Sequence, residues 1–145
     1  KYLLKQKQKI NICIVRIFSY TSFNQDISFF IPSIYKKFLT NNFLKLDNMD
    51  HIRDFIDIRD IYSAIKLLYL KKYRGIYNLG SGKSIPLIKI VEHLANLFKK
   101  KYIINKPNKQ TKHVANLSKI IKLGWRPKKS VVKILNDYHL NFKKK

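Results

Sequence analysis

The run Ile10 to Phe18 (INICIVRIF) constrains the fold more than any other part of the 145-residue sequence. Its residues are mostly apolar and β-branched, and they do not alternate with polar residues. Such a run is typical of a strand buried on both faces, usually within a parallel sheet. It therefore predicts a chain whose other strands lie beside it and whose helices cover the sheet.

The rest of the sequence alternates between short apolar runs and helical stripes, which indicates an α/β chain. We expect strands at 43–47, 53–56, 76–79 and 102–105 and helices at 27–39, 57–69, 84–98, 118–123 and 130–140, with a loop at 19–26. In the second helix, Ile58, Ile61, Ile65 and Leu68 share one face, which predicts that this face is buried. Ser84 and Ser130 are the expected caps of the third and fifth helices.

A formal net charge of +23 first suggests nucleic acid or an anionic membrane as a partner. Arginine is scarce, however, and lysine, isoleucine, asparagine, tyrosine and phenylalanine, which A/T-rich codons encode, are abundant. Base readout and bidentate phosphate binding favour arginine over lysine. The lysines are also spread along the chain, so we expect no nucleic-acid ligand.

The single cysteine, Cys13, lies in the apolar run, where a buried and reduced thiol is expected, and one cysteine allows no disulfide framework. No apolar stretch has membrane-spanning length, and the N-terminal segment lacks a signal-peptide cleavage site. We therefore expect a cytoplasmic protein without a membrane partner. None of the four histidines is spaced for metal binding with cysteine or another histidine, so no metal site is expected.

The segment GSGK at 80–83 follows an expected strand and precedes a helix, as phosphate-binding loops do. A Walker A loop would need glycine at Tyr77, and a dinucleotide-binding loop would need it at Ile85. We therefore interpret the segment as a tight turn between a strand and a helix.

The segment RDFIDIRD at 53–60 joins an expected strand to a helix. Asp57 can cap that helix, and Asp60 in its first turn complements the helix dipole, so both acids have structural explanations. Arg53 lies at the start of the strand and has no such explanation. The sequence leaves the role of Arg59 open.

Four motifs, in order, resemble the C-terminal half of extended short-chain dehydrogenases, the NAD-dependent epimerase/dehydratase family acting on nucleotide sugars. They are IVRIF with its following loop, RDFIDIRDIYSAI, IYNLGSGKSIPLIKIVEHL and ANLSKIIKLGWRPKKSVVKIL. Each motif is weak alone, but together they cover nearly the whole chain with the right spacing. RIFSYTSFNQ, FFIP and NMDHIRDFIDIRD also resemble the GDP-4-dehydro-6-deoxymannose reductases within this family.

The resemblance implies the C-terminal portion of an extended Rossmann-type fold, with the last strands of the nucleotide-binding sheet and a small α/β substrate-binding subdomain. Residues 1–19 would end the Rossmann-type domain. Residues 20–145 would form the substrate-binding portion, with 57–80 returning to the sheet.

The resemblance also implies roles for single residues. The arginine matching Arg53 grips the substrate diphosphate, and the aromatic residue matching Phe55 lines the nucleotide pocket. Lys106 matches a second arginine and keeps its charge without its planar fork. Lys109 matches an acid that holds the ribose, and Ser19 matches an asparagine of the R-x-F-N segment. These three departures from the family pattern put sugar-nucleotide affinity in doubt.

In the family, the glycine-rich loop for NAD or NADP and the catalytic Tyr-x-x-x-Lys pair precede the matched motifs, so this resemblance assigns no catalytic residue to the chain. It implies that the reaction requires an N-terminal half, and that the strand Ile10 to Phe18 would otherwise expose an apolar edge open to a partner or to self-association. The alternatives are a basic module for nucleic acid or anionic surfaces, and a catalytically silent family remnant kept for oligomerisation.

Overall fold

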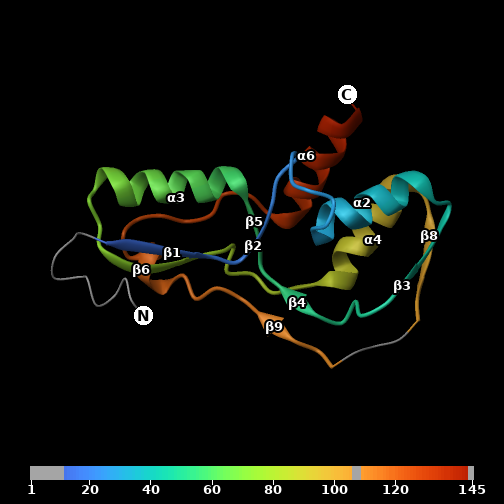
Figure 1. Cartoon of the computed structure of the whole chain (residues 1–145), viewed down its shortest axis with the longest axis horizontal. Coiled ribbons are helices and arrows are strands. Elements are labelled where there is room, and N and C mark those ends of the chain that lie inside the picture. Colours follow the sequence, from blue (N-terminus) through green and yellow to red (C-terminus); the bar gives the residue numbers. More distant parts are fainter. Residues whose placement is uncertain (1–11, 106–108, 144–145) are drawn as a thin grey trace.

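The computed structural model describes residues 12–105 and 109–143, with the side chains of the last two left out. The strands are β1 (Cys13–Ile17), β2 (Ser19–Thr21), β3 (Phe43–Leu46), β4 (Ile52–Arg53), β5 (Phe55–Asp57), β6 (Gly75–Leu79), β7 (Ile85–Pro86), β8 (Lys101–Ile104) and β9 (Lys112–His113). The helices are α2 (Phe30–Thr40), α3 (Ile58–Leu70), α4 (Leu87–Phe98), α5 (Ser118–Ile121) and α6 (Val131–Lys143). Figure 1 shows an elongated molecule whose elements gather at two ends around a junction formed by β2, β5 and α6.

At one end, β1 and β6 pair in parallel, with Cys13 opposite Gly75 and Ile17 opposite Leu79. Helix α3 leads from β5 to β6 and packs along the β1–β6 pair (Figure 1). Its buried side chains form a core with Tyr77 and Leu79 of β6 and with residues from Ala115 to Trp125. After α3 the chain forms β6 beside β1, and the segment after β9 also joins this end.

The other end is built on α2 and α4, which pack against each other and share a core with the parallel pair of β3 and β8. A second core fills this end and includes Leu135 and Tyr138 of α6. Strand β5 lies between the two cores, because Phe55 belongs to this one and Ile56 to the other. Strand β5 thus contributes a side chain to each core.

The described part of the run Ile10 to Phe18 is a strand, but it is not buried on both faces. Cys13, Arg16 and Ile17 are exposed, while Ile14 and Val15 are half-buried. The expectation of a buried thiol at Cys13 was wrong. Among the described residues only β6 pairs with β1. The strand is therefore less buried than its apolar sequence predicts.

Helix α3 also differs from the expected burial. Ile61, Ala64 and Leu68 are buried with Asp60, but Ile58 and Ile65, beside them on the helix, are 42% and 43% exposed. The apolar surface of this helix is therefore wider than the face that the described core covers.

Most other differences between the expected and the observed structure involve short elements. The loop expected at 19–26 begins with β2, which pairs in parallel with β5. The strand expected at 53–56 is divided at Asp54 into β4 and β5, which belong to different sheets. Helix α4 begins after Pro86 and has no side-chain cap, so the expected cap at Ser84 was wrong.

The end of the chain follows the expectation more closely. The hydroxyl of Ser130 accepts a hydrogen bond of 3.2 Å from the backbone N–H of Lys133 at the start of α6, as a capping residue does. In the part of the chain that the structure describes, no helix is both long and apolar enough to span a bilayer.

Candidate functional site

A cavity of about 620 Å³ opens where β2, β4, β5 and the start of α2 meet. Most of its lining is apolar or aromatic, including Tyr20, Phe29, Phe30 and Phe55. Its polar lining comes from Ser19, Gln25, Arg53 and His113. The structure thus brings together three of the five residues that the family resemblance singled out, from three different strands.

Arg53 reaches the cavity from β4, and Thr111, the residue before β9, helps to hold its guanidinium. Its Nη1 donates to the carbonyl oxygens of Ile52 at 2.9 Å and Thr111 at 3.0 Å. Its Nη2 donates to the hydroxyl of Thr111 at 3.0 Å. His113 is the register partner of Arg53 in the parallel β4–β9 pair, so both side chains reach the same cavity.

Phe55 and Ser19 are paired neighbours in the parallel β2–β5 sheet. Phe55 is buried and packs near Phe30, with ring centroids 6.2 Å apart. Beside them, the Gln25 amide nitrogen donates to the carbonyl of Tyr20 at 3.2 Å. The Gln25 amide oxygen is buried and has no hydrogen-bond partner in the described chain.

The two lysines that the resemblance singled out are not brought to this cavity by the described structure. Lys106 lies outside the described residues. Lys109 is exposed and is not part of the cavity lining.

Asp54, between Arg53 and Phe55, was missed from the sequence and is 0% exposed. Its carboxylate accepts hydrogen bonds from the backbone N–H groups of Ser81 at 2.5 Å, Gly82 at 2.9 Å and Ala115 at 3.0 Å, and from the Ser81 hydroxyl at 2.6 Å. A Cβ atom at Gly80 would collide with this carboxylate and with the Ala115 side chain. The only early sign of this role is the alternation of Arg53 and Phe55 with Asp54 and Ile56, which places Asp54 on the opposite side from Arg53.

This arrangement decides what the glycine turn at 80–82 can hold. The N–H groups that would cradle a phosphate already donate to a carboxylate, and a second anion there would be repelled by it. The turn therefore does not fit the pyrophosphate of a dinucleotide, in agreement with its interpretation as a structural turn.

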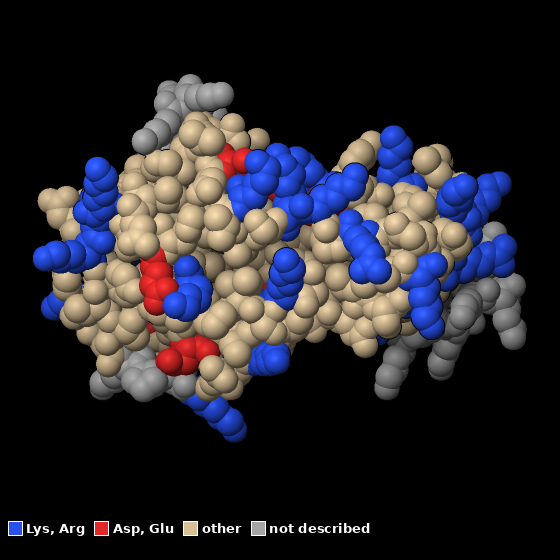
Figure 2. Space-filling view, turned by 180° about the vertical axis from the view of Figure 1, so that it is seen from behind, with Lys and Arg blue, Asp and Glu red and all other residues tan. Residues whose placement is uncertain are grey.

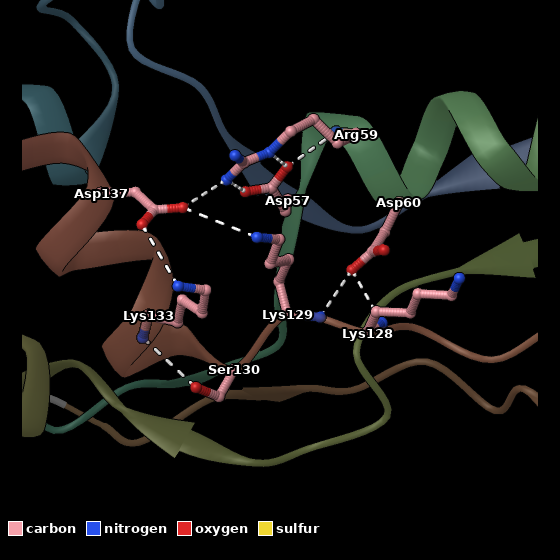
Figure 3. A network of polar contacts seen from close by, with 8 residues as sticks. All are labelled: Asp57, Arg59, Asp60, Lys128, Lys129, Ser130, Lys133 and Asp137. Atoms are coloured by element: carbon pink, nitrogen blue, oxygen red, sulfur yellow. Dashed lines mark hydrogen bonds and ion pairs between the residues drawn. The ribbon is translucent and has the colours of Figure 1, made fainter. Parts of the chain in front are cut away.

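A network of polar contacts ties the start of α3 to α6 (Figure 3). Asp57 caps α3 by accepting from the backbone N–H of Arg59 at 2.8 Å, and it also accepts from Arg59 Nε at 2.7 Å and Nη2 at 2.6 Å. Arg59 Nη2 further donates to Asp137 of α6 at 2.8 Å. Asp60 accepts from the backbone N–H groups of Lys128 and Lys129, both at 3.0 Å. Arg59, which the sequence left open, therefore has a structural role.

Charge and burial oppose each other in this network. Burial alone would raise the pKa of Asp57, but hydrogen bonds from Arg59 and the charges of Arg59 and Lys129 outweigh burial, so its pKa is lowered. Hydrogen bonding from Arg59 is the main cause of the lowered pKa of Asp137. Both carboxylates are thus held in their charged form.

The spacing Y-x-x-x-K does occur twice in the sequence, at Tyr62–Lys66 and Tyr102–Lys106. Tyr62 is 67% exposed on the outer side of α3 and takes no part in lining the cavity. Tyr102 lies in β8, also away from the lining, and Lys106 lies outside the described residues. Neither tyrosine supplies an acid/base group to the cavity. Within the described ranges, no group of three potential metal ligands is found.

The sequence model of the NAD dependent epimerase/dehydratase family matches residues 2–80, more than half of the chain. No curated protein matched. Among solved structures, RMD from Pseudomonas aeruginosa complexed with NADPH is similar with a TM-score of 0.86 and 21% identity, over 97% of this chain and 52% of that chain.

Two other solved structures show the same fold. The UDP-glucose 4-epimerase of Thermotoga maritima with UDP-glucose has a TM-score of 0.83 and 19% identity, over 99% of this chain and 50% of that chain. The dTDP-glucose 4,6-dehydratase of Bacillus anthracis in complex with NAD has a TM-score of 0.83 and 20% identity, over 98% of this chain and 48% of that chain. The chain spans about half the length of these proteins and has the fold of that portion. It belongs to the NAD dependent epimerase/dehydratase family.

Proposed function

We propose that this chain is the nucleotide-sugar-binding part of an NAD(P)-dependent sugar-nucleotide epimerase, dehydratase or reductase. The observation that carries the proposal is the cavity in which Arg53 meets an aromatic and apolar lining. An arginine fork suits a phosphate, and an aromatic surface suits a base or a sugar face. A solved structure of the same fold is a complex with UDP-glucose, which supports this ligand class.

The cavity offers each part of such a ligand a different chemistry. Arg53 and His113 stand on the β4–β9 side, where an anion would be received. Phe29 and Phe55 provide apolar contact area, and Phe29 remains 46% exposed before any ligand binds. Ser19, a polar residue of the same lining, can exchange a hydrogen bond with a hydroxyl or an amino group of the ligand.

The described residues do not supply the hydride-transfer chemistry. Among the described residues, the cavity lining contains no tyrosine–lysine pair, and the glycine turn does not fit a dinucleotide. NAD or NADP would supply the hydride acceptor or donor from a site on a second α/β unit, joined to this one in the same chain or binding to it. This chain's own residues bind and orient the nucleotide sugar and are expected to give no turnover alone.

The surface for that second unit is the exposed side of β1 with the outer stripe of α3. The stripe consists of Ile58, Tyr62, Ile65 and Tyr69, at helical spacing and 42–79% exposed. A cavity of about 360 Å³ lies between the strand and the helix, lined by residues of β1, of α3 and of the segment that follows α3. An apolar strand edge beside an apolar helix stripe is suited to covering by another strand and helix, and it favours self-association when uncovered.

A nucleic-acid function has no specific observation in its favour. On the face in Figure 2, lysine and arginine side chains are scattered from one end of the molecule to the other and do not follow a single track. Base readout would require a local set of arginine and aromatic side chains, which this scatter does not provide.

Calorimetric titration with GDP- and UDP-sugars tests the proposal, with the chain alone and with the N-terminal half of a family member added. We expect saturable binding of at least one nucleotide sugar and its loss in Arg53→Ala. Arg126→Ala, which removes an exposed arginine outside the cavity lining, is the matched control and should bind as the wild type does. Unchanged affinity in Arg53→Ala would refute the assignment, and a steep salt dependence of binding to random DNA would favour the nucleic-acid alternative.

A further inference from the structure

The hydrogen bonds of Arg53 occupy one edge of its guanidinium and leave another edge open. The group has five N–H donors in a fixed plane. Nη1 donates to the carbonyls of Ile52 and Thr111, and Nη2 donates to the Thr111 hydroxyl. Thr111 thus binds the outer edge, formed by Nη1 and Nη2, through its backbone and its side chain together.

The donors that remain are Nε–H and the second Nη2–H. Among the described residues, neither has a hydrogen-bond partner, and both lie on the same edge. The same edge of another arginine, Arg59, binds a carboxylate: its Nε and Nη2 donate to the two oxygens of Asp57 at 2.7 and 2.6 Å. The open edge of Arg53 is therefore a fork for two oxygens of one anionic group.

Thr111 is itself held in place. Its carbonyl oxygen accepts from the backbone N–H of Ile52 at 2.8 Å, which belongs to the β4–β9 pairing. Its N–H and its hydroxyl lie 3.3 and 3.2 Å from Nδ1 of His51. Since the backbone N–H can only donate, Nδ1 of His51 acts as an acceptor in this arrangement.

We propose that Thr111 is a positioning residue: it fixes the Nη1–Nη2 edge of Arg53, so that the Nε–Nη2 edge receives one phosphate group of the ligand. This inference rests on the proposed function and specifies how the site takes its diphosphate. A long arginine side chain loses rotational freedom when it binds an anion, and Thr111 reduces that loss by ordering the fork beforehand.

Three variants of the full chain separate this role from a purely structural one. Thr111→Val keeps the shape and removes the hydroxyl, while Thr111→Ser keeps the hydroxyl. Thr40→Val is the matched control, because the Thr40 hydroxyl bonds the Lys36 carbonyl at 3.2 Å on the surface of α2. Affinity is measured by fluorescence anisotropy with MANT-labelled GDP and UDP, and the order of the fork by NMR of the Arg53 side-chain N–H signals.

We expect Thr111→Val to weaken nucleotide binding about fivefold, the effect of losing one partly exposed charge-assisted hydrogen bond. Thr111→Ser should restore most of the affinity, and Thr40→Val should not change it. The Nη signals of Arg53 should be resolved in the wild type and in Thr111→Ser, and should merge in Thr111→Val as the group rotates more freely.

Wild-type affinity in Thr111→Val, or equal losses in Thr111→Val and Thr111→Ser, would overturn the positioning role. If Arg53→Ala abolishes binding while Thr111→Val leaves it intact, this inference fails and the proposed function stands. If the wild type binds neither labelled nucleotide, both fail together.

Discussion

The buried carboxylate of Asp54 is the strongest single tie between β5, the glycine turn and the segment after β9. We predict that Asp54→Ala destabilises the chain substantially, because the substitution removes the acceptor of three backbone N–H groups and one hydroxyl. Ala115 is buried and Ser81 half-buried, so their N–H groups would lose their partners with little access to water. Gly82 is exposed, and its N–H can bond to water instead.

Each buried N–H left without a partner costs about 1–3 kcal/mol. Two such groups, with little added for Gly82, give a loss of about 3 kcal/mol, a large part of the ~5–15 kcal/mol by which domains are usually stable. Gly80→Ala should cost a similar amount, because its Cβ would push the same carboxylate from its place.

Pulse proteolysis in urea at low protein concentration measures this loss while limiting self-association. With an m-value of about 2 kcal/mol/M, Asp54→Ala should lower the urea midpoint by about 1.5 M. Asp47→Ala, which removes an exposed acid, is the matched control and should leave the midpoint unchanged. A decrease of less than about 0.5 M in Asp54→Ala would refute the hydrogen-bond account.

Two further predictions concern the network at α3 and its outer stripe. Because the pKa values of Asp57 and Asp137 are lowered, their stabilising effect is complete above the ordinary aspartate pKa of about 3.9 and is lost as pH falls through the lowered values. The urea midpoint should therefore decrease across this acid range, and less steeply in Arg59→Gln; equal slopes would contradict the prediction. The double variant Tyr62→Ser, Tyr69→Ser should reduce self-association in sedimentation velocity, and an unchanged oligomer distribution would show that the stripe is not the associating surface.

The segment RDFIDIRD shows how far sequence reasoning reaches. Capping by Asp57 is local chemistry, since donor and acceptor are two residues apart, and the sequence predicts it. The partners of Asp54 lie 27 to 61 residues away and Asp137 lies 78 residues from Arg59, so no local pattern identifies them.

The short strands were missed for a related reason. Strands β7 and β9 have two residues each, too few to show alternation, and pairing with β4 alone defines them. His113 reaches the cavity only through that pairing, so its place in the lining was not predictable.

Strand β1 presents the opposite case, because the sequence indicates more burial than the described chain provides. The run Ile10 to Phe18 is suited to two covered faces, while the structure leaves Cys13 and Ile17 exposed. An apolar strand sequence of this kind indicates the strand itself and also a neighbouring element that covers it.

The central claim is that a nucleotide sugar occupies the cavity with its diphosphate on Arg53. Chemical-shift mapping by heteronuclear NMR, with GDP- and UDP-sugars added to the full chain, tests it most directly. We predict saturable shifts at the Arg53 Nε–H and at lining residues such as Ser19 and Phe55, and none in Arg53→Ala. Shifts spread over the lysine-bearing surface without saturation, or no shifts at the cavity, would contradict the claim.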